Sequence, residues 1–447
     1  MNTQILSRRA FLRKTSLITL VSVVPSFVTG IRANQTPNNK LNIGCIGIAG
    51  RGADNISELA SENIMALCDV DDQHAAATYA RFPNAKRFKD FRQMLDELGK
   101  QLDAIVVSTP DHTHAVAAMA AIKAGKHVYC EKPLAHSIFE VRELVKASKK
   151  YNVVTQLGNQ GHSYNSIRAF KEWIEDGVIG EVKEVHAMCS SVYGHAELID
   201  EAHKPMPVPQ GLDWDLWLGP VQFKPYNKVY VPGKWRGWSA FGTGVIGDWT
   251  CHVIDPVFWA LELDAPVKIL AESNDYDPIK HAETFPKASK IYFEFPAKGN
   301  RPKISLYWYD GSARPERPPE LDSSQQLPNI GALVIGSDGK ILYGSHGAGG
   351  LTVLPRSRMK TLSQNPKRIP SSPGHHKEWV QACKDRKLTT GSNFSYGGPL
   401  TEIALLGIIA LRFKGQELHW DPEGMRFTNC DQANQFIKPI YRQGWQL

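Results

Sequence analysis

The sequence predicts an α/β protein with two domains, the first built around a doubly wound parallel sheet and the second, of α+β type, around a mostly antiparallel open sheet. From Leu41 to about Leu157, short apolar runs alternate with amphipathic stretches of helical length, which is typical of parallel strands joined by helical crossovers. Beyond that point the apolar runs become longer and often alternate with polar residues, which favours antiparallel strands. The 447 residues also exceed one ordinary domain. We therefore expect one domain over residues 41–160 and a second over residues 161–447.

In the first domain, predicted strands and helices alternate along the chain. The strands are the apolar runs Leu41–Ile48, Ile64–Cys68, Ala104–Val107, His127–Cys130 and Val153–Leu157. The helices are the amphipathic stretches Gln73–Phe82, Phe91–Leu98, His114–Ala124 and Ile138–Lys149.

The second domain mixes strands, helices and long loops. The predicted strands are Val182–Ser191, Lys290–Phe295, Ile304–Tyr309 and a hairpin within Leu333–Leu342 that turns at Ser337-Asp338-Gly339. The predicted helices are Ile167–Asp176, Asp248–Leu261, His376–Lys384 and Leu400–Phe413. Two proline-rich segments, Ala202–Pro232 and Ala297–Pro328, should be loops.

The first 33 residues have the composition of a targeting segment. The stretch Ser7-Arg8-Arg9-Ala10-Phe11-Leu12-Arg13-Lys14 resembles the twin-arginine export signal. The apolar run that follows it, Leu17–Val28, is shorter than the roughly 20 residues that a spanning helix needs. No other segment reaches that length, so we expect export to the periplasm in the folded state and no stable membrane span after the signal is removed. An ordinary Sec signal and an uncleaved anchor stay open as alternatives.

Composition argues against two classes of protein. The formal charge is +7, but five basic residues lie in the first 33 residues and no acidic residue precedes Asp54. The rest of the chain therefore lacks the basic footprint of a nucleic-acid-binding protein. Seven scattered cysteines without a C-x-x-C pair do not make a disulfide scaffold, and we expect them to be buried as small apolar side chains.

A glycine-rich turn follows the first predicted strand. Gly47-Ile48-Ala49-Gly50-Arg51-Gly52 is the G-x-G-x-x-G pattern with alanine at its second glycine, in which backbone N–H groups at a helix N-terminus bind a pyrophosphate. Asp69 ends the next strand, 22 residues after Gly47, where a carboxylate can accept hydrogen bonds from the adenosine ribose or simply cap a helix. The order of strand, turn, helix, strand and acid predicts a Rossmann domain that binds NAD. NADP is disfavoured because Asp69 would repel its 2′-phosphate, although Arg51 could instead reach that phosphate.

Two further motifs follow the ends of predicted strands, where ligands bind in an open parallel sheet. They are Cys130-Glu131-Lys132-Pro133 and Thr109-Pro110-Asp111-His112-Thr113-His114. Together with the glycine turn, they resemble the Gfo/Idh/MocA family of oxidoreductases. The resemblance implies that Glu131 and Lys132 lie beside the nicotinamide, that Lys132 donates to the reacting substrate oxygen, and that Thr109 and His114 lie near the cofactor. Asp111 and Thr113 could equally be helix caps.

The second domain carries an acid and a histidine at helical spacing. If Asp248 begins a helix, His252 lies one turn later and Asp255 a further turn along the same face. The family has an Asp-x-x-x-His at the corresponding place, so by resemblance His252 is the general base for the substrate hydroxyl and Asp248 orients or charge-stabilises its imidazole. A buried structural histidine and a divalent-metal site are the alternatives. We expect no metal, because no further ligand stands at a matching spacing and the family needs none.

Polar and aromatic residues near the domain junction are candidates for contacts to a polyhydroxylated ligand. Those at the junction could equally form a hydrogen-bond network between the domains, and a single tryptophan more often packs in a core. The candidates are Asn159, Gln160, His162, Tyr193, Trp235 and, from the helix described above, Asp255. The loop Ala202–Pro232 is a candidate lid over the nicotinamide half of the cofactor.

The C-terminal run Tyr441-Arg442-Gln443-Gly444-Trp445 and the export signal resemble the exported bacterial branch of the family. The resemblance implies an NAD-dependent oxidoreductase that takes hydride from a secondary hydroxyl of a sugar or sugar derivative, and we also expect a homo-oligomer formed through the C-terminal sheet. The alternative function is an NAD-dependent glycosidase that oxidises, eliminates, hydrates and reduces in a closed cycle with a retained cofactor. A catalytically silent binding protein is a third hypothesis, against which the joint presence of Lys132, Asp248 and His252 argues.

Overall fold

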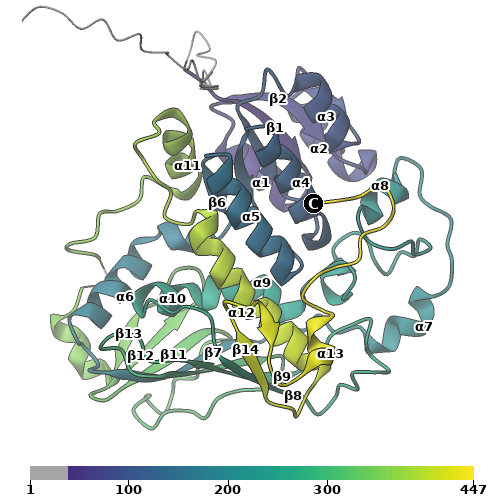
Figure 1. Ribbon diagram of the computed structural model, residues 1–447. Helices are drawn as coiled ribbons and strands as arrows, with labels where there is room; N and C mark the ends of the chain where they lie inside the picture. Colours follow the sequence, from purple (N-terminus) through teal and green to yellow (C-terminus); the bar gives the residue numbers. More distant parts are fainter. Residues whose placement is uncertain (1–38, 364) are drawn as a thin grey trace, which may run out of the picture. The chain divides into compact units, whose positions relative to one another are not determined.

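The computed structural model describes residues 39–363 and 365–447, so the predicted export signal lies outside the described residues. Its first sheet has six parallel strands in the order β3-β2-β1-β4-β5-β6 (Figure 1). The strand order reverses between β1 and β4, and ligands bind at the carboxyl ends of strands at such a reversal. The strands are β1 (Asn42–Ile46), β2 (Asn63–Cys68), β3 (Lys86–Phe88), β4 (Ala104–Val107), β5 (His127–Cys130) and β6 (Thr155–Leu157).

The helices of this half connect the strands, and most begin with a capping side chain. Asp71, Asp90 and Ser137 accept hydrogen bonds from backbone N–H groups at the starts of three of them, as N-cap residues do. The first and fourth helices differ, because Gly50 and Pro110 precede them and no side chain of the described residues caps their N–H groups. The helices are α1 (Arg51–Glu58), α2 (Asp72–Arg81), α3 (Phe91–Leu98), α4 (Asp111–Lys123) and α5 (Ile138–Lys150).

The second sheet has nine strands in the order β13-β12-β11-β7-β10-β9-β8-β14-β15. Among the described strands of this sheet, only the pairing of β7 with β10 is parallel, so the predicted mostly antiparallel sheet is confirmed, as is the hairpin at Ser337-Asp338-Gly339. The strands are β7 (Val182–Cys189), β8 (Lys268–Glu272), β9 (Ser289–Phe295), β10 (Ile304–Asp310), β11 (Ile330–Gly336), β12 (Lys340–Gly344), β13 (Thr352–Leu354), β14 (Leu418–Asp421) and β15 (Arg426–Phe427).

Helices and 3-10 turns complete the second half. The α-helices are α6 (Asn165–Glu175), α7 (Ile199–Ala202), α8 (Trp214–Leu218), α9 (Gly244–Val253), α10 (Asp255–Ala260), α11 (His375–Lys384), α12 (Phe394–Arg412) and α13 (Asp431–Asn434). The 3-10 turns are η1 (Gln160–Ser163), η2 (Ala196–Leu198), η3 (Lys234–Gly237) and η4 (Arg356–Thr361).

The predicted helix Asp248–Leu261 is wrong in its start and its continuity. The chain becomes helical at Gly244, so Asp248 lies inside α9 rather than at its beginning. A second helix, α10, begins at Asp255 with Pro256 in its first turn. Pro256 has no N–H group to donate to the His252 oxygen four residues earlier, and that oxygen accepts from the His346 N–H instead, which explains the interruption between the two helices.

The long helix α12 is apolar enough to be mistaken for a membrane span. By length and composition it could cross a bilayer, but 78% of its most apolar window is buried inside the protein. It packs against α5, α9 and β8, which makes it a core helix. Because α12 is long and apolar enough to span a membrane, the expectation that no other segment reaches spanning length was wrong, although its burial shows that it belongs to the core.

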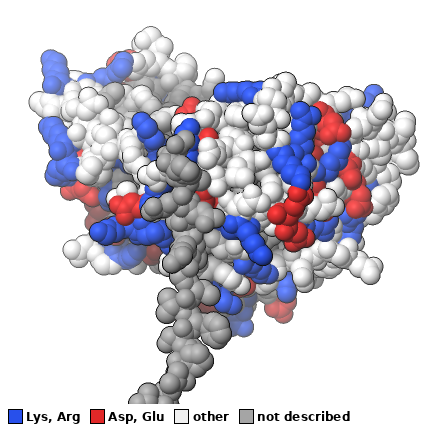
Figure 2. Space-filling model, turned by 90° about the horizontal axis from the view of Figure 1, so that it is seen from above, with Lys and Arg blue, Asp and Glu red and all other residues white. Residues whose placement is uncertain are grey.

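Two compositional expectations concern the cysteines and the charged surface. All seven cysteines are buried and unpaired, as predicted. On the face shown in Figure 2, basic and acidic side chains are interspersed, which agrees with the mixed charge of the chain after its N-terminal segment.

Candidate active site

A cavity of about 620 Å³ lies at the carboxyl ends of the strands of the first sheet, and residues of both halves of the chain line it. A cavity of this size can hold a small molecule or part of a cofactor. From the first half it is lined by Gly47, Ala49, Gly50, Arg51, Asp69, Thr109, Glu131, Lys132 and Gln160. From the second half it is lined by Trp235, Arg236, Asp248, Trp249, His252 and His346, among others.

The glycine turn is shaped by close backbone contacts on one side and is open on the other. A Cβ atom at Gly47, whose φ is +74°, would lie 2.7 Å from the carbonyl oxygen of Ser108, and one at Gly52 would lie 2.0 Å from that of Gly47. No atom of the described part of the chain lies within 4 Å of the corresponding position at Gly50. Gly52 thus shapes the turn without lining the cavity. No side chain of the described residues caps the N-terminus of α1, whose positive dipole end can attract an anion such as a pyrophosphate.

Asp69 is held at the end of β2 with its carboxyl group on the cavity wall. The carboxylate accepts hydrogen bonds from the backbone N–H groups of Ile48 (2.9 Å) and Asp71 (3.0 Å). Burial raises the pKa of Asp69, and the two N–H groups oppose that shift. The cap of α2 is Asp71, so Asp69 is not the helix cap considered as its alternative role.

Arg51 points across the cavity to Glu131. Its Nε donates to Glu131 Oε1 at 3.0 Å, and the amide nitrogen of Asn55 donates to the same oxygen at 3.0 Å. With the Gln160 amide turned so that its oxygen faces the guanidinium, that oxygen accepts from Arg51 at 2.6 Å. Glu131 and Gln160 thus bind this guanidinium. We therefore do not expect Arg51 to bind a 2′-phosphate, which was the alternative role considered for it.

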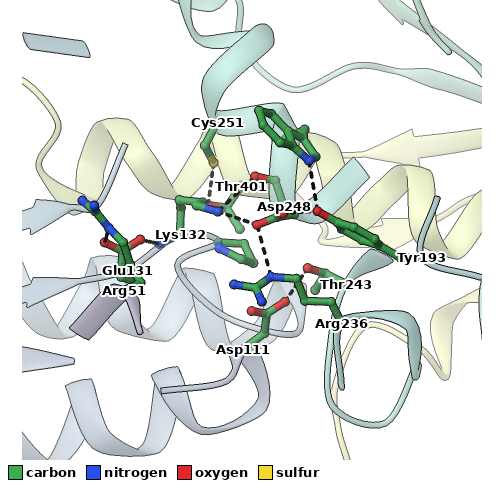
Figure 3. A network of polar contacts seen from close by, with 12 residues as sticks. Arg51, Asp111, Glu131, Lys132, Tyr193, Arg236, Thr243, Asp248, Cys251 and Thr401 are labelled. Atoms are coloured by element: carbon green, nitrogen blue, oxygen red, sulfur yellow. Dashed lines mark hydrogen bonds and ion pairs between the residues drawn. The ribbon is translucent and has the colours of Figure 1, made fainter. Parts of the chain in front are cut away.

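A buried ion pair joins the two halves of the chain inside the cavity (Figure 3). Lys132 Nζ donates to the carboxylate of Asp248 and, at 3.3 Å, to its backbone oxygen. The Tyr193 hydroxyl donates to Asp248 Oδ2 at 2.7 Å, and Arg236 Nε lies 3.5 Å from Oδ1. Tyr193 thus holds Asp248 and is absent from the cavity wall where a substrate contact was predicted.

Each charge of this pair offsets the effect of burial on the pKa of its partner. Burial disfavours both charges, yet Lys132 and Arg236 hold the pKa of Asp248 below its usual value. Burial lowers the pKa of Lys132, whereas the charge of Asp248 raises it, and the net shift is upward. Lys132 is therefore a cation with hydrogen-bond donors in the cavity, suited to stabilising negative charge on a substrate oxygen.

His252 is a neutral imidazole that Asp248 does not orient. No hydrogen bond between the two side chains is present among the described residues, because the Asp248 oxygens bind Lys132 and Tyr193 instead. Of the two predicted roles of Asp248, orienting the imidazole is therefore wrong, whereas its negative charge does raise the pKa of His252, as charge stabilisation requires. The ring of His252 stacks on that of His346, with centroids 4.1 Å apart. Burial, with Lys132 and His346, lowers the pKa of His252 well below its usual value. A neutral imidazole can accept a proton, as a general base must.

His346 is a cavity residue that the sequence analysis missed. It follows β12 in a loop and has a φ of +56°, which is uncommon for a residue with a side chain and often accompanies functional sites. Its N–H donates to the backbone oxygen of His252 at 3.1 Å, and its Nδ1 lies 2.9 Å from Ser345 Oγ. A backbone conformation of this kind leaves no pattern in sequence spacing.

Three predicted substrate residues are buried together away from the cavity. His162 Nδ1 lies 3.0 Å from Asp255 Oδ1, and the Asn159 amide donates to Asp255 Oδ2 at 3.2 Å. Their exposed fractions are 0% for Asn159, 3% for His162 and 1% for Asp255. The three form the hydrogen-bond network that was the alternative prediction. Gln160 and Trp235 do line the cavity.

His114 supports the cavity from behind and does not line it. Its ring nitrogens lie 2.7 Å from the oxygen of Pro133 and 2.8 Å from that of Thr109, and the residue is 1% exposed. It links two cavity loops, so the predicted cofactor contact is corrected to a positioning role. Among the described residues, no group of three or more His, Cys, Asp or Glu side chains could hold a metal ion.

Comparisons with known proteins match both halves of the chain. Residues 41–159 match the Gfo/Idh/MocA sequence model described as oxidoreductase family, NAD-binding Rossmann fold. Residues 164–298 match the model described as oxidoreductase family, C-terminal alpha/beta domain. Together the two models cover more than half of the chain.

Curated relatives are similar over part of their length. The inositol 2-dehydrogenase of Salmonella typhimurium is 26% identical over 202 residues, 43% of this chain and 58% of the relative. The 1,5-anhydro-D-fructose reductase of Ensifer adhaerens is 31% identical over 179 residues, 39% of this chain and 41% of the relative. The 2,7-anhydro-N-acetylneuraminate hydratase of Escherichia coli is 27% identical over 146 residues, 33% of this chain and 39% of the relative. The chain thus spans about half the length of the curated relatives it matches.

Solved structures share the fold at low identity. An inositol dehydrogenase homolog from Azotobacter vinelandii, complexed with NADH and myo-inositol, is 15% identical with a TM-score of 0.56, covering 85% of this chain and 98% of that one. A levoglucosan dehydrogenase, in complex with NADH and levoglucosan, is 17% identical with a TM-score of 0.56, covering 85% and 99%.

The buried ion pair gives a prediction for stability. The variant Asp248→Asn leaves Lys132 and Arg236 buried without their shared counter-charge, and we expect it to lower the free energy of unfolding by about 3 kcal/mol, measured by urea unfolding at neutral pH. Adding Lys132→Met should recover part of the loss. The matched control Asp54→Asn removes a carboxylate that is 70% exposed and should change stability by less than about 0.5 kcal/mol. Equal losses for Asp248→Asn and Asp54→Asn would contradict the importance of the pair.

Proposed function

Because the chain belongs to the Gfo/Idh/MocA family of oxidoreductases, we propose that it oxidises a secondary hydroxyl of a sugar or polyol with NAD as hydride acceptor. The observation that carries this proposal is the placement of Lys132, Asp248 and His252 in the same cavity as the glycine turn and Asp69. Relatives named for inositol, levoglucosan and anhydrofructose chemistry support the substrate class.

Residues 41–159 form an NAD-binding Rossmann domain, and the shape of the turn fits the cofactor. The open position at Gly50 and the uncapped start of α1 would hold the pyrophosphate. Asp69, fixed by two backbone N–H groups, would accept hydrogen bonds from the adenosine ribose. When bound, NAD supplies the hydride acceptor that this chemistry requires.

The chain's own residues supply the proton transfers and the charge stabilisation. Lys132 would donate to the substrate oxygen and stabilise the negative charge that develops on it as the O–H proton departs. His252, neutral because it is buried beside Lys132, would accept that proton. Asp248 keeps Lys132 charged and positioned, and Tyr193 holds Asp248 in turn.

Two observations favour the closed-cycle glycosidase as a second candidate. Oxidation of an alcohol needs one base, whereas the cavity presents two neighbouring imidazoles, His252 and His346. Elimination of an aglycone and addition of water would use a second acid–base group, and one relative is named as a hydratase of an anhydro-sugar. Product analysis separates the candidates, because only the simple oxidoreductase gives a net redox change.

The catalytic assignment predicts the behaviour of two variants. Lys132→Ala and His252→Ala should each lower turnover of the sugar or polyol by about a hundredfold or more, as the loss of electrostatic or acid–base groups commonly does. Binding of the nucleotide should survive His252→Ala, measured by calorimetry. Near-normal turnover in both variants would refute the site assignment, and absence of any turnover of sugars in the unaltered protein would favour the silent binding protein.

Cofactor choice follows from Asp69. The unaltered protein should bind NAD more tightly than NADP, because the carboxylate and a 2′-phosphate would repel each other in a partly desolvated pocket. Asp69→Asn, which removes the charge with little change of shape, should narrow the difference. Tighter binding of NADP than of NAD by the unaltered protein in calorimetry would overturn this prediction.

We also propose export to the periplasm through the twin-arginine route, which the Arg8-Arg9 pair and its Phe-Leu sequence support. Folding in the cytoplasm would allow the Rossmann domain to be loaded with NAD before export. Replacing Arg8 and Arg9 by lysine should keep the protein in the cytoplasmic fraction of producing cells. Unchanged export of this variant would point to the Sec route instead.

A further inference from the structure

The C-terminal end of the chain crosses from the second half back to the first. In Figure 1 it runs from α13 to the vicinity of α4 and α8. The Phe139 N–H donates to the oxygen of Ile437 at 3.1 Å, and Lys123 Nζ donates to that of Leu447 at 2.8 Å. We call residues 437–447 the C-terminal hook. Its attachments show that the hook is docked on the first half of the chain.

Arg442 fastens the hook to α8. Its guanidinium pairs with the carboxylate of Asp215 and donates to the backbone oxygens of Asp215 (2.9 Å) and Gly219 (3.1 Å). Its own N–H donates to the oxygen of Pro220 at 2.9 Å. The side chain is only 15% exposed, so several charge-assisted bonds hold the hook at one place.

Trp445, near the tip of the hook, lines the cavity. Its ring lies 6.1 Å from that of Phe91, and the Arg92 guanidinium lies 4.3 Å from its centroid. Both neighbours begin α3, directly after β3. Because β3 pairs with β2 and Phe88 accepts a hydrogen bond from the Asp69 N–H, Trp445 lies at the Asp69 end of the cavity.

The segment around α8 covers the same end. Asp213 N–H donates to the oxygen of Val70 at 2.8 Å, and Asp72 N–H donates to that of Gly211 at 3.1 Å. Leu212 and Leu216 line the cavity there. The loop Ala202–Pro232 was predicted to cover the nicotinamide half of the cofactor. Its residues 210–217 instead attach beside Asp69, at the end where the ribose of adenosine would lie.

We propose that Trp445, fastened through Arg442, forms with Leu212 and Leu216 the wall of an adenine site that retains the dinucleotide. The inference rests on the proposed binding of NAD. A purine offers two flat faces, and aromatic and aliphatic side chains are its usual partners. Release of the nucleotide requires this wall to open, and the hook and α8 are fastened to each other. The cofactor is thereby held as a resident group, as an exported enzyme far from a supply of free NAD would need.

The test measures how fast NADH leaves the loaded full-length protein. The protein is diluted into excess NAD, and release is monitored as the loss of the fluorescence of bound NADH. Trp445→Ala and Arg442→Ala should each speed release about tenfold or more, while Trp445→Phe, which keeps an aromatic face, should stay within about threefold. The matched control is Arg426→Ala, an arginine with 66% of its side chain exposed whose partner is Asp421. It should release NADH at the rate of the unaltered protein.

A second measurement locates the effect. In charcoal-treated full-length protein, Trp445→Ala should weaken binding of ADP about tenfold and leave binding of nicotinamide mononucleotide unchanged. If Trp445→Ala released NADH and bound ADP like the unaltered protein, the proposed adenine wall would be wrong, while the proposed function would stand. Failure of the unaltered protein to bind any of these nucleotides would overturn the proposed function and the inference together.

Discussion

The buried ion pair between Lys132 and Asp248 is the interaction on which the rest of the site depends. Lys132 follows β5 of the parallel sheet and Asp248 lies inside α9 of the second half, so the pair is made only when both halves are folded against each other. Two charges with little exposure cost free energy unless they are well paired. The carboxylate meets this condition with Lys132, Tyr193 and Arg236 around it. One constraint thus joins the halves and keeps a cation ready in the cavity.

The remaining groups are arranged around that cation. Its positive charge, together with burial, keeps His252 neutral, so the same lysine that would stabilise a substrate oxygen also keeps its neighbour able to accept a proton. Glu131, next in sequence, binds Arg51 and Asn55 of the glycine turn and helix α1. The turn that would hold the pyrophosphate is therefore hydrogen-bonded to the residue that directly precedes Lys132. Assembly through the C-terminal sheet and the domain boundary at residue 160 stay predictions.

The sequence was sufficient where function follows from local order along the chain. The glycine turn, Asp69 and Lys132 each stand next to a strand whose apolar run is unmistakable, and all three line the cavity. It failed where side-chain direction decides the outcome. Asp255 has helical spacing from Asp248, yet its carboxylate binds Asn159 and His162 away from the cavity. Asp248 binds a lysine 116 residues away rather than the histidine one turn later. His346 and Trp445 come from a loop and a chain end whose positions only the tertiary fold fixes.

The most direct test of hydride transfer in this cavity uses substrates labelled at carbon. The protein loaded with NAD is incubated with sugars and polyols, including myo-inositol, levoglucosan and simple glycosides, whose carbon-bound hydrogens are deuterium. The nucleotide is then released by denaturation, and its mass is measured by mass spectrometry. Both the oxidoreductase and the closed-cycle enzyme predict that part of the nucleotide carries one deuterium. Recovery of the nucleotide without deuterium from every mixture would contradict the account.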